Sequence, residues 1–293
     1  MSKYYYLIAG LPNLLLEDGK PPFSVSGFKE ELNSYLTVTD KKLHDLFFLK
    51  FDNKNLLNQL RHPDYDPDLK GNITQDEFGE LFNELKNAEE ENSSGTKNKR
   101  IPAYIAEFVR LYLETEAKEE RSAISWEDRL ATLYYAYAVA CSNRFVAAWF
   151  ALNLNINNVL AAITCRKYGL DRSNYIVGDS EIANHLRTSN ARDFELGDSL
   201  EYLPDVLRIA EETDLLLREK KIDQLKWEWL DDNTFSRVFD IESVLAYLLK
   251  LELLERWATL DKATGEKTFR GLVGAMKKGS DNALEEFKRN NKK

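Results

Sequence analysis

The sequence predicts an all-α fold, and three observations carry that prediction. Gly and Pro number 13 and 7 in 293 residues, about 7% against a usual ~12%, and 30% of the residues are charged. Apolar residues recur at helical spacing along most of the chain, whereas the strict alternation of a half-buried strand is hard to find. A chain of this length buries roughly three quarters of its unfolded surface, so we predict a single domain, 1–293, that needs no metal or disulfide to fold.

The first elements are a short apolar segment and a connection. Tyr4–Leu11 could be mistaken for a signal peptide, but one lysine precedes it, Pro12 interrupts it and no small-residue cleavage site follows. We therefore expect a buried first element. The stretch Leu16–Gly27 contains two glycines and two prolines, which predicts an extended connection.

Helices with clear starting signals follow. Ile101–Pro102 precedes an apolar stripe formed by Tyr104, Ile105, Phe108, Leu111 and Tyr112. Leu203–Pro204 opens a second helix, and Asp240 is a candidate N-cap for a third that continues to Leu251. Between these elements, Ala88–Arg100 is polar and predicts an exposed loop, and the residues from Lys277 predict a short terminal helix.

The segment Leu133–Leu152 is the candidate for a membrane span, because it is rich in aromatic and aliphatic residues. Ser142, Asn143 and Arg144 lie at its middle, where an arginine costs about 2.5–3.5 kcal/mol on insertion scales. We predict instead an apolar helix enclosed in a larger helical fold. The two cysteines form no disulfide framework, so a reducing cytoplasm is the expected location.

Charge and missing motifs exclude several classes of function. The net charge of −9 argues against a nucleic-acid-binding face and against a polybasic segment that binds anionic lipid. The motifs GxxxxGK[ST], GxSxG and GxGxxG are missing from the sequence, so nucleotide binding and acyl transfer have no support. We therefore expect neither catalytic residues nor a cofactor.

The segment Asp66–Glu77 matches part of the twelve-residue EF-hand pattern, with acids at positions 1 and 3, glycine at 6 and glutamate at 12. Position 5 is Lys70, and its ammonium opposes Ca²⁺. The same residues also predict a turn followed by a capping box, with Thr74 as N-cap and Glu77 as its partner three residues on. We prefer the capping box and predict that calcium does not bind.

Two further sets of polar residues are weak candidates for chemistry. His44, His62 and His185 do not share a helical spacing, so a metal site could arise only through folding. Asp231–Asp232 resembles the start of the aspartate-rich Mg²⁺ motif of all-α prenyl-transfer enzymes, but Phe235 stands where the next Asp is needed. We predict that no metal binds at either set.

A short pattern occurs three times and suggests an internal repeat. Each copy has Asp or Asn, then an amide or hydroxyl residue three positions on, then two aliphatic residues. These pairs, predicted to be N-caps at the start of repeat helices near 52, 155 and 240, are Asp52 and Asn55, Asn155 and Asn158, and Asp240 and Ser243.

At these residues the chain resembles the C/d family of central-stalk proteins in V/A-type rotary ATPases, in a divergent bacterial branch. That family carries segments of the form D-x-x-N followed by aliphatic residues and an Arg. Arg61 matches in the first copy and Arg166, displaced by two positions, in the second. In the third copy the Arg is missing, and Leu249 and Lys250 stand near its expected position. The stretch Phe239–Trp257 is similar to the family's VLAYLL helix.

The resemblance implies an all-helical, funnel-like body of three similar subdomains without an active site. Such a protein belongs to the central stalk, links the rotor shaft of the catalytic head to the membrane proteolipid ring, and transmits torque for ion transport. Its expected place is cytoplasmic and peripheral to the membrane, with no span, no nucleic acid and no small-molecule substrate. The alternatives are a free-standing helical scaffold and an all-α enzyme using carboxylates around Asp231.

Overall fold

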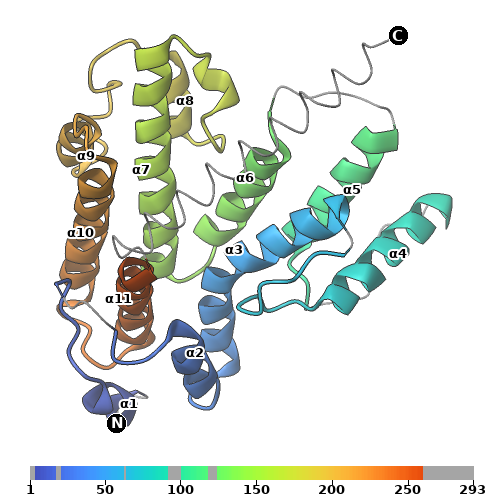
Figure 1. Ribbon diagram of the computed structural model, residues 1–293, viewed down its shortest axis with the longest axis horizontal. Coiled ribbons are helices and arrows are strands. Elements are labelled where there is room, and N and C mark those ends of the chain that lie inside the picture. The colour runs from blue at the N-terminus through green and yellow to red at the C-terminus, as the bar shows by residue number, and fades with distance from the viewer. Residues whose placement is uncertain (1–3, 18–20, 63, 92–99, 118–123, 260–293) are drawn as a thin grey trace, which may run out of the picture. The chain divides into compact units, whose positions relative to one another are not determined.

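A computed structural model shows that the protein is all-α (Figure 1). It describes residues 4–17, 21–62, 64–91, 100–117 and 124–259. Within these ranges there are eleven α-helices, one short 3₁₀-helix and no β-strand. The helices are α1 Tyr5–Gly10, α2 Val25–Asn33, α3 Val38–Arg61, α4 Gln75–Glu91, α5 Ala103–Ala117, α6 Trp126–Val139, α7 Arg144–Tyr168, η1 Arg172–Asn174, α8 Glu181–Thr188, α9 Leu203–Ala210, α10 Leu215–Thr234 and α11 Ile241–Thr259.

The chain divides into two compact units. Unit 1 combines residues 1–32 with residues 238–293, and unit 2 comprises residues 33–237. This division does not test the predicted organisation in three repeats, which stays a prediction.

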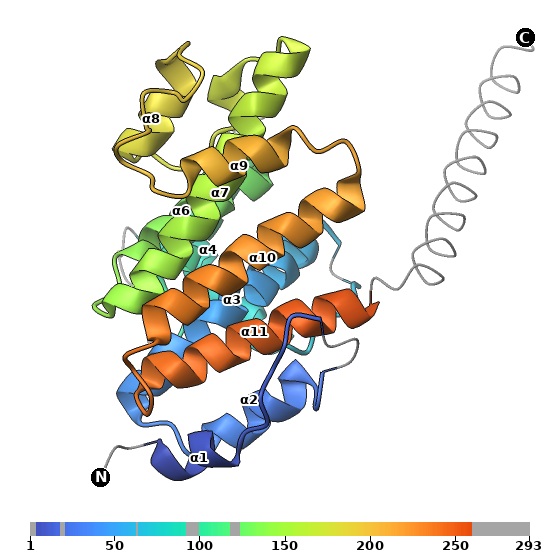
Figure 2. The same ribbon diagram turned by 90° about the vertical axis from the view of Figure 1, so that its left-hand side faces the viewer.

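In unit 1, α1 and α2 accompany α11, so the first two helices fold together with the last of the described helices (Figure 2). The ring of Tyr247 in α11 lies 6.1 Å from that of Phe23 and 5.3 Å from that of Phe28, and its hydroxyl donates to the Pro12 carbonyl at 3.0 Å. The Glu255 carboxylate accepts the Val25 N–H at 2.8 Å and so satisfies one of the free amides at the start of α2. Side chains of α11 therefore fix both the connection and the helix that follow α1.

In unit 2, α7 is the central helix, in contact with α6, α8 and α9. Phe150 stacks on Phe47 of α3 at 5.2 Å, while Trp229 of α10 lies 5.6 Å from Phe145 and 5.7 Å from Trp149. Among the described helices, α7 is long and apolar enough to cross a membrane, but 56% of its most apolar window is buried inside the protein. A helix that is apolar on most sides is what the interior of a large helical unit requires.

The predicted single helix over Leu133–Leu152 is wrong, because the segment is two helices. α6 ends at Val139, and Asn143 starts α7 by accepting the Val146 N–H at 3.0 Å. Of the polar residues that argued against a membrane span, Ser142 and Asn143 lie between the two helices and Arg144 is the first residue of α7. Asn143 is one of the strongest N-cap residue types, which explains why the chain breaks here despite its apolar composition.

The other predicted elements agree with the structure in most places. The helices after Pro102, Leu203 and Asp240 are α5, α9 and α11. The first element was predicted to be buried, but it is buried only in part. Tyr4 and Leu7 are buried, whereas Tyr6 is 77% exposed. A short helix at the surface can bury only one of its faces. The polar loop is also shorter than predicted, since α4 continues to Glu91, and α2 already begins at Val25 within the predicted connection. The predicted terminal helix from Lys277 lies outside the described residues.

Candidate functional site

The first repeated motif holds the loop that follows α3. Asn55 is buried, and its side-chain amide makes two hydrogen bonds with one residue: Nδ2 donates to the Asp68 carbonyl and Oδ1 accepts the Asp68 N–H, both at 2.9 Å. An amide side chain has one donor end and one acceptor end, so it can pair with both polar groups of a residue in the way a neighbouring strand does. We call this arrangement the first clamp.

Asp52 strengthens the first clamp one helical turn earlier. Its carboxylate is fully buried and accepts the N–H groups of Asn72 and Ile73 at 2.7 and 2.8 Å. Gly71 lies so close that a Cβ there would stand 2.6 Å from Asp52 Oδ1. Glycine is needed at this position because the loop backbone approaches the carboxylate too closely for any side chain.

The second repeated motif makes the same kind of contact from α7. Asn158 is 1% exposed; its Nδ2 donates to the Val177 carbonyl at 2.8 Å and its Oδ1 accepts the Val177 N–H at 2.9 Å. One turn earlier, Asn155 donates to the hydroxyl of Tyr202, which immediately precedes α9. Burial raises the pKa of Tyr202, so this hydroxyl stays protonated at neutral pH. We call Asn158 with Val177 the second clamp.

The prediction that these residues are N-caps is therefore wrong for both copies. Asp52 and Asn55 lie inside α3, whose N-cap is Thr37, and Asn155 and Asn158 lie inside α7, whose N-cap is Asn143. Asp and Asn are favoured wherever backbone N–H groups lack partners, and loops supply such groups as helix starts do. The sequence pattern alone did not distinguish the two situations.

The third copy differs from the first two. Asp240 immediately precedes α11, as predicted for an N-cap position, and its carbonyl accepts the Ser243 N–H at 3.2 Å. The Ser243 hydroxyl oxygen is buried and has no hydrogen-bond partner within the described residues. A serine side chain is also too short to form the two-bond contact made by Asn55 and Asn158.

The two arginines of the family-like motif play different parts. Arg61 donates to the Glu127 carboxylate at 2.6 Å; this bond raises the pKa of Arg61 and lowers that of Glu127. Both side chains are more than a third exposed, so the pair contributes little to stability. Arg166 stacks its guanidinium 4.1 Å from the Phe194 ring centroid and donates to the Ala191 carbonyl, and burial lowers its pKa.

Sequence reasoning missed Arg172, which organises the turn after α8. Its guanidinium donates to the carbonyls of Leu186 and Ser189 at 3.1 and 2.5 Å. A third bond goes to Asn190 Oδ1 at 3.1 Å. The only signal was its basic side chain in a polar stretch after Gly169, which predicts no particular partner.

The EF-hand-like segment contains the predicted capping box. Thr74 N donates to Glu77 Oε2 at 2.9 Å, and Glu77 N donates back to Thr74 Oγ1 at 3.3 Å, at the start of α4. The Lys70 ammonium lies 5.6 Å from the centre of the Phe51 ring. A cation at a ligand position disfavours Ca²⁺, and the absence of calcium binding stays a prediction.

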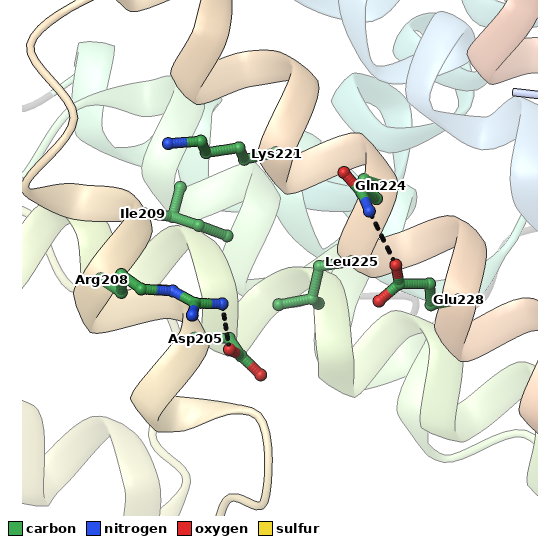
Figure 3. Close-up of a pocket in the computed structure, with 7 residues that line it drawn as sticks. All are labelled: Asp205, Arg208, Ile209, Lys221, Gln224, Leu225 and Glu228. Atoms are coloured by element: carbon green, nitrogen blue, oxygen red, sulfur yellow. Dashed lines mark hydrogen bonds and ion pairs between the residues drawn. The ribbon is translucent and has the colours of Figure 1, made fainter. Parts of the chain in front are cut away.

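A cavity of about 440 Å³ lies between α9 and α10 (Figure 3). Its polar side chains are already paired: Arg208 with Asp205 at 2.7 Å and Gln224 with Glu228 at 2.9 Å, as the dashed lines show. Lys221 also donates, to Glu212 outside the cavity. Arg208 and Lys221 are thus each paired with a carboxylate, and the remaining charge of the cavity is the Glu228 carboxylate, which accepts a hydrogen bond from the neutral Gln224 amide.

The weaker candidates from the sequence do not come together. Asp231 and Asp232 are exposed near the end of α10, whereas Trp227 on the same helix is buried. His44 is fully buried in α3, and its Nδ1 lies 3.1 Å from the neighbouring Asp45 carboxylate. Over the described part of the chain, no group of three His, Cys, Asp or Glu residues could hold a metal ion.

Fold and contacts together define an all-helical protein whose long helices α3 and α7 hold neighbouring loops through buried amide side chains. The chain belongs to the family described as "Protein of unknown function (DUF2764)", whose model matches residues 1–280. No curated protein and no solved structure matches the chain.

Proposed function

We propose that the protein is a non-catalytic central-stalk component of a V/A-type rotary ATPase, which links the rotor shaft to the membrane proteolipid ring and transmits torque. The observation that supports this most directly is the pair of clamps. The resemblance to the C/d family rests on repeated D-x-x-N-like segments, and the first two copies make equivalent contacts, Asn55 with Asp68 and Asn158 with Val177. Because the two segments make equivalent contacts, their similarity is better explained by a structural repeat than by a coincidence of sequence.

Surface chemistry is a second support. Three consecutive leucines at the start of α10, Leu215–Leu217, are 41–64% exposed, and Tyr168 at the end of α7 is 66% exposed. Large apolar side chains left at the surface commonly mark places where another protein binds. An adaptor that must bind partners at more than one place needs surfaces of this kind, each burying about 1,600 Å² in a standard interface.

Purification from cells that express the ATPase tests the proposal. The protein is tagged at its C-terminus, extracted in mild detergent and isolated by the tag. The proposal predicts recovery of the catalytic, shaft and proteolipid subunits in fixed stoichiometry. Contacts with basic partner loops should weaken as salt rises, because the chain carries a net charge of −9.

A protein that repeatedly emerges alone, from cells in which the ATPase is intact, would contradict the proposal and leave the free-standing scaffold as the better interpretation. Gene order gives an independent check. Genes for rotary-ATPase subunits beside this gene would strengthen the assignment, and an isolated gene would weaken it.

A further inference from the structure

A groove in unit 2 has the size and lining of a binding site that the clamps do not use. It has a volume of about 480 Å³, within the roughly 300–1,000 Å³ typical of ligand sites, and lies among α5, α6 and the segment around η1. Leu111 of α5, Leu133 of α6, Ile124 and Ile176 form its apolar part. Ile176 is 5% exposed, so its side chain belongs to the core as well as to the groove.

Three charged residues, Glu107, Arg110 and Glu114, run along the α5 wall. Spacings of three and four place them on one face of the helix, where neighbours of opposite charge usually pair. None of the three makes an ion pair or hydrogen bond within the described part of the chain. Arg110 is nevertheless half-buried. The α5 wall therefore presents an acidic, basic and acidic series that is available to a partner.

The opposite walls differ, because their charged groups are engaged within the protein. Arg187 donates to the carbonyls of Ile176 and Gly178 and so fixes the wall itself. Asp128 accepts the Ser125 hydroxyl at 2.8 Å at the start of α6, and Arg129 stacks 5.2 Å from the centre of the Trp126 ring. The specificity of the groove must come mainly from α5.

We propose that this groove binds an amphipathic helix of a partner that carries a basic, acidic and basic series. At a rise of 1.5 Å per residue, Arg110 lies ~4.5 Å and Glu114 ~10.5 Å along the axis from Glu107. A second helix lying alongside presents side chains at the same spacings, and its apolar residues between them reach Leu111 and Leu133. The inference rests on the proposed function, since the partner helix is assigned to the rotor shaft of the ATPase.

The charge pattern favours a helix over a small molecule. In a small-ligand site a few polar groups point toward the same place. The charges of Glu107, Arg110 and Glu114 instead extend over ~10.5 Å along α5. Acids on both sides of Arg110 also repel a compact anion such as phosphate. A helix with alternating charges meets all three side chains without placing like charges opposite one another.

The test is a triple charge reversal, Glu107→Lys with Arg110→Glu and Glu114→Lys, in the full-length tagged protein. Glu80→Lys, on the exposed surface of α4, is the matched control, because it changes the net charge by the same amount. Far-ultraviolet circular dichroism and thermal unfolding establish that both variants fold. The measurements are the shaft subunits recovered with each protein and the affinity of each for purified shaft subunits.

We expect the reversal to lower affinity for the shaft at least ~10-fold, because like charges then face each other across the interface, and Glu80→Lys to leave it unchanged. Equal recovery of the shaft by all three proteins would overturn the groove assignment while leaving the proposed function intact. A wild-type protein that recovers no ATPase subunit would overturn both. Native mass spectrometry that finds a small molecule bound to the wild type and lost on Arg110→Glu would overturn the helix and identify a ligand site instead.

Discussion

Removing the amide of Asn158 tests the second clamp directly. In Asn158→Ala, the Val177 N–H and carbonyl both lose their partner, and the side chain removed is 1% exposed in the native protein. A neutral hydrogen bond contributes about 0.5–1.5 kcal/mol, and a buried group left without a partner costs about 1–3. Because Val177 is only half-buried, water can reach part of the gap. We therefore expect a loss of about 2–4 kcal/mol in the free energy of unfolding.

Urea denaturation followed by tryptophan fluorescence measures this loss, since Trp149 and Trp229 lie together in the same unit. Asn233→Ala is the control: it makes the same chemical change at an exposed residue of α10, whose amide bonds, among the residues that the structure describes, to the Trp229 carbonyl one turn earlier. It should change stability by less than about 0.5 kcal/mol. An Asn158→Ala variant as stable as this control would refute the assignment of Asn158 as a clamp.

Three further predictions concern other parts of the molecule. Gly71→Ala should cost about 2 kcal/mol or more in unfolding free energy, because its Cβ would stand 2.6 Å from Asp52 Oδ1; a variant that melts like the wild type would contradict this geometry. Calorimetric titration of the Asp66–Glu77 loop should give no Ca²⁺ dissociation constant below about 10⁻⁵ M, since Lys70 occupies a ligand position. Burial raises the pKa of Tyr247 from 10.0 to about 12, so its contribution to stability is complete below pH 10 and is lost as pH rises through 12. Tyr247→Phe should therefore make the loss of stability between pH 10 and 12 smaller than in the wild type, and an unchanged profile would argue against this assignment.

Much of the fold was predictable because helices are specified locally. The stripe containing Tyr104, Ile105 and Phe108 is buried in α5, and the Thr74–Glu77 capping box forms at the start of α4. Both signals depend on residues within one or two turns of each other. The break at Asn143 was the main error in the helix pattern, because a run of apolar residues hides a strong N-cap inside it.

The clamps were less predictable, since their partners are distant in sequence. Asn55 binds a residue 13 positions on, and Asn158 a residue 19 positions on. The sequence identifies both as repeated polar residues beside aliphatic ones, but only the fold shows that they face a loop. The groove was harder still, because nothing in the spacing of Glu107, Arg110 and Glu114 distinguishes an ordinary intrahelical series from one left unpaired.

The clamps also bear on which loop residues tolerate substitution. Asn55 and Asn158 bind main-chain atoms of Asp68 and Val177, so the identity of the clamped residue matters little. The intervening segment already differs in length between the two copies. A loop held in this way therefore tolerates substitution at the clamped residue itself, whereas a position such as Gly71, whose backbone lies against the Asp52 carboxylate, does not.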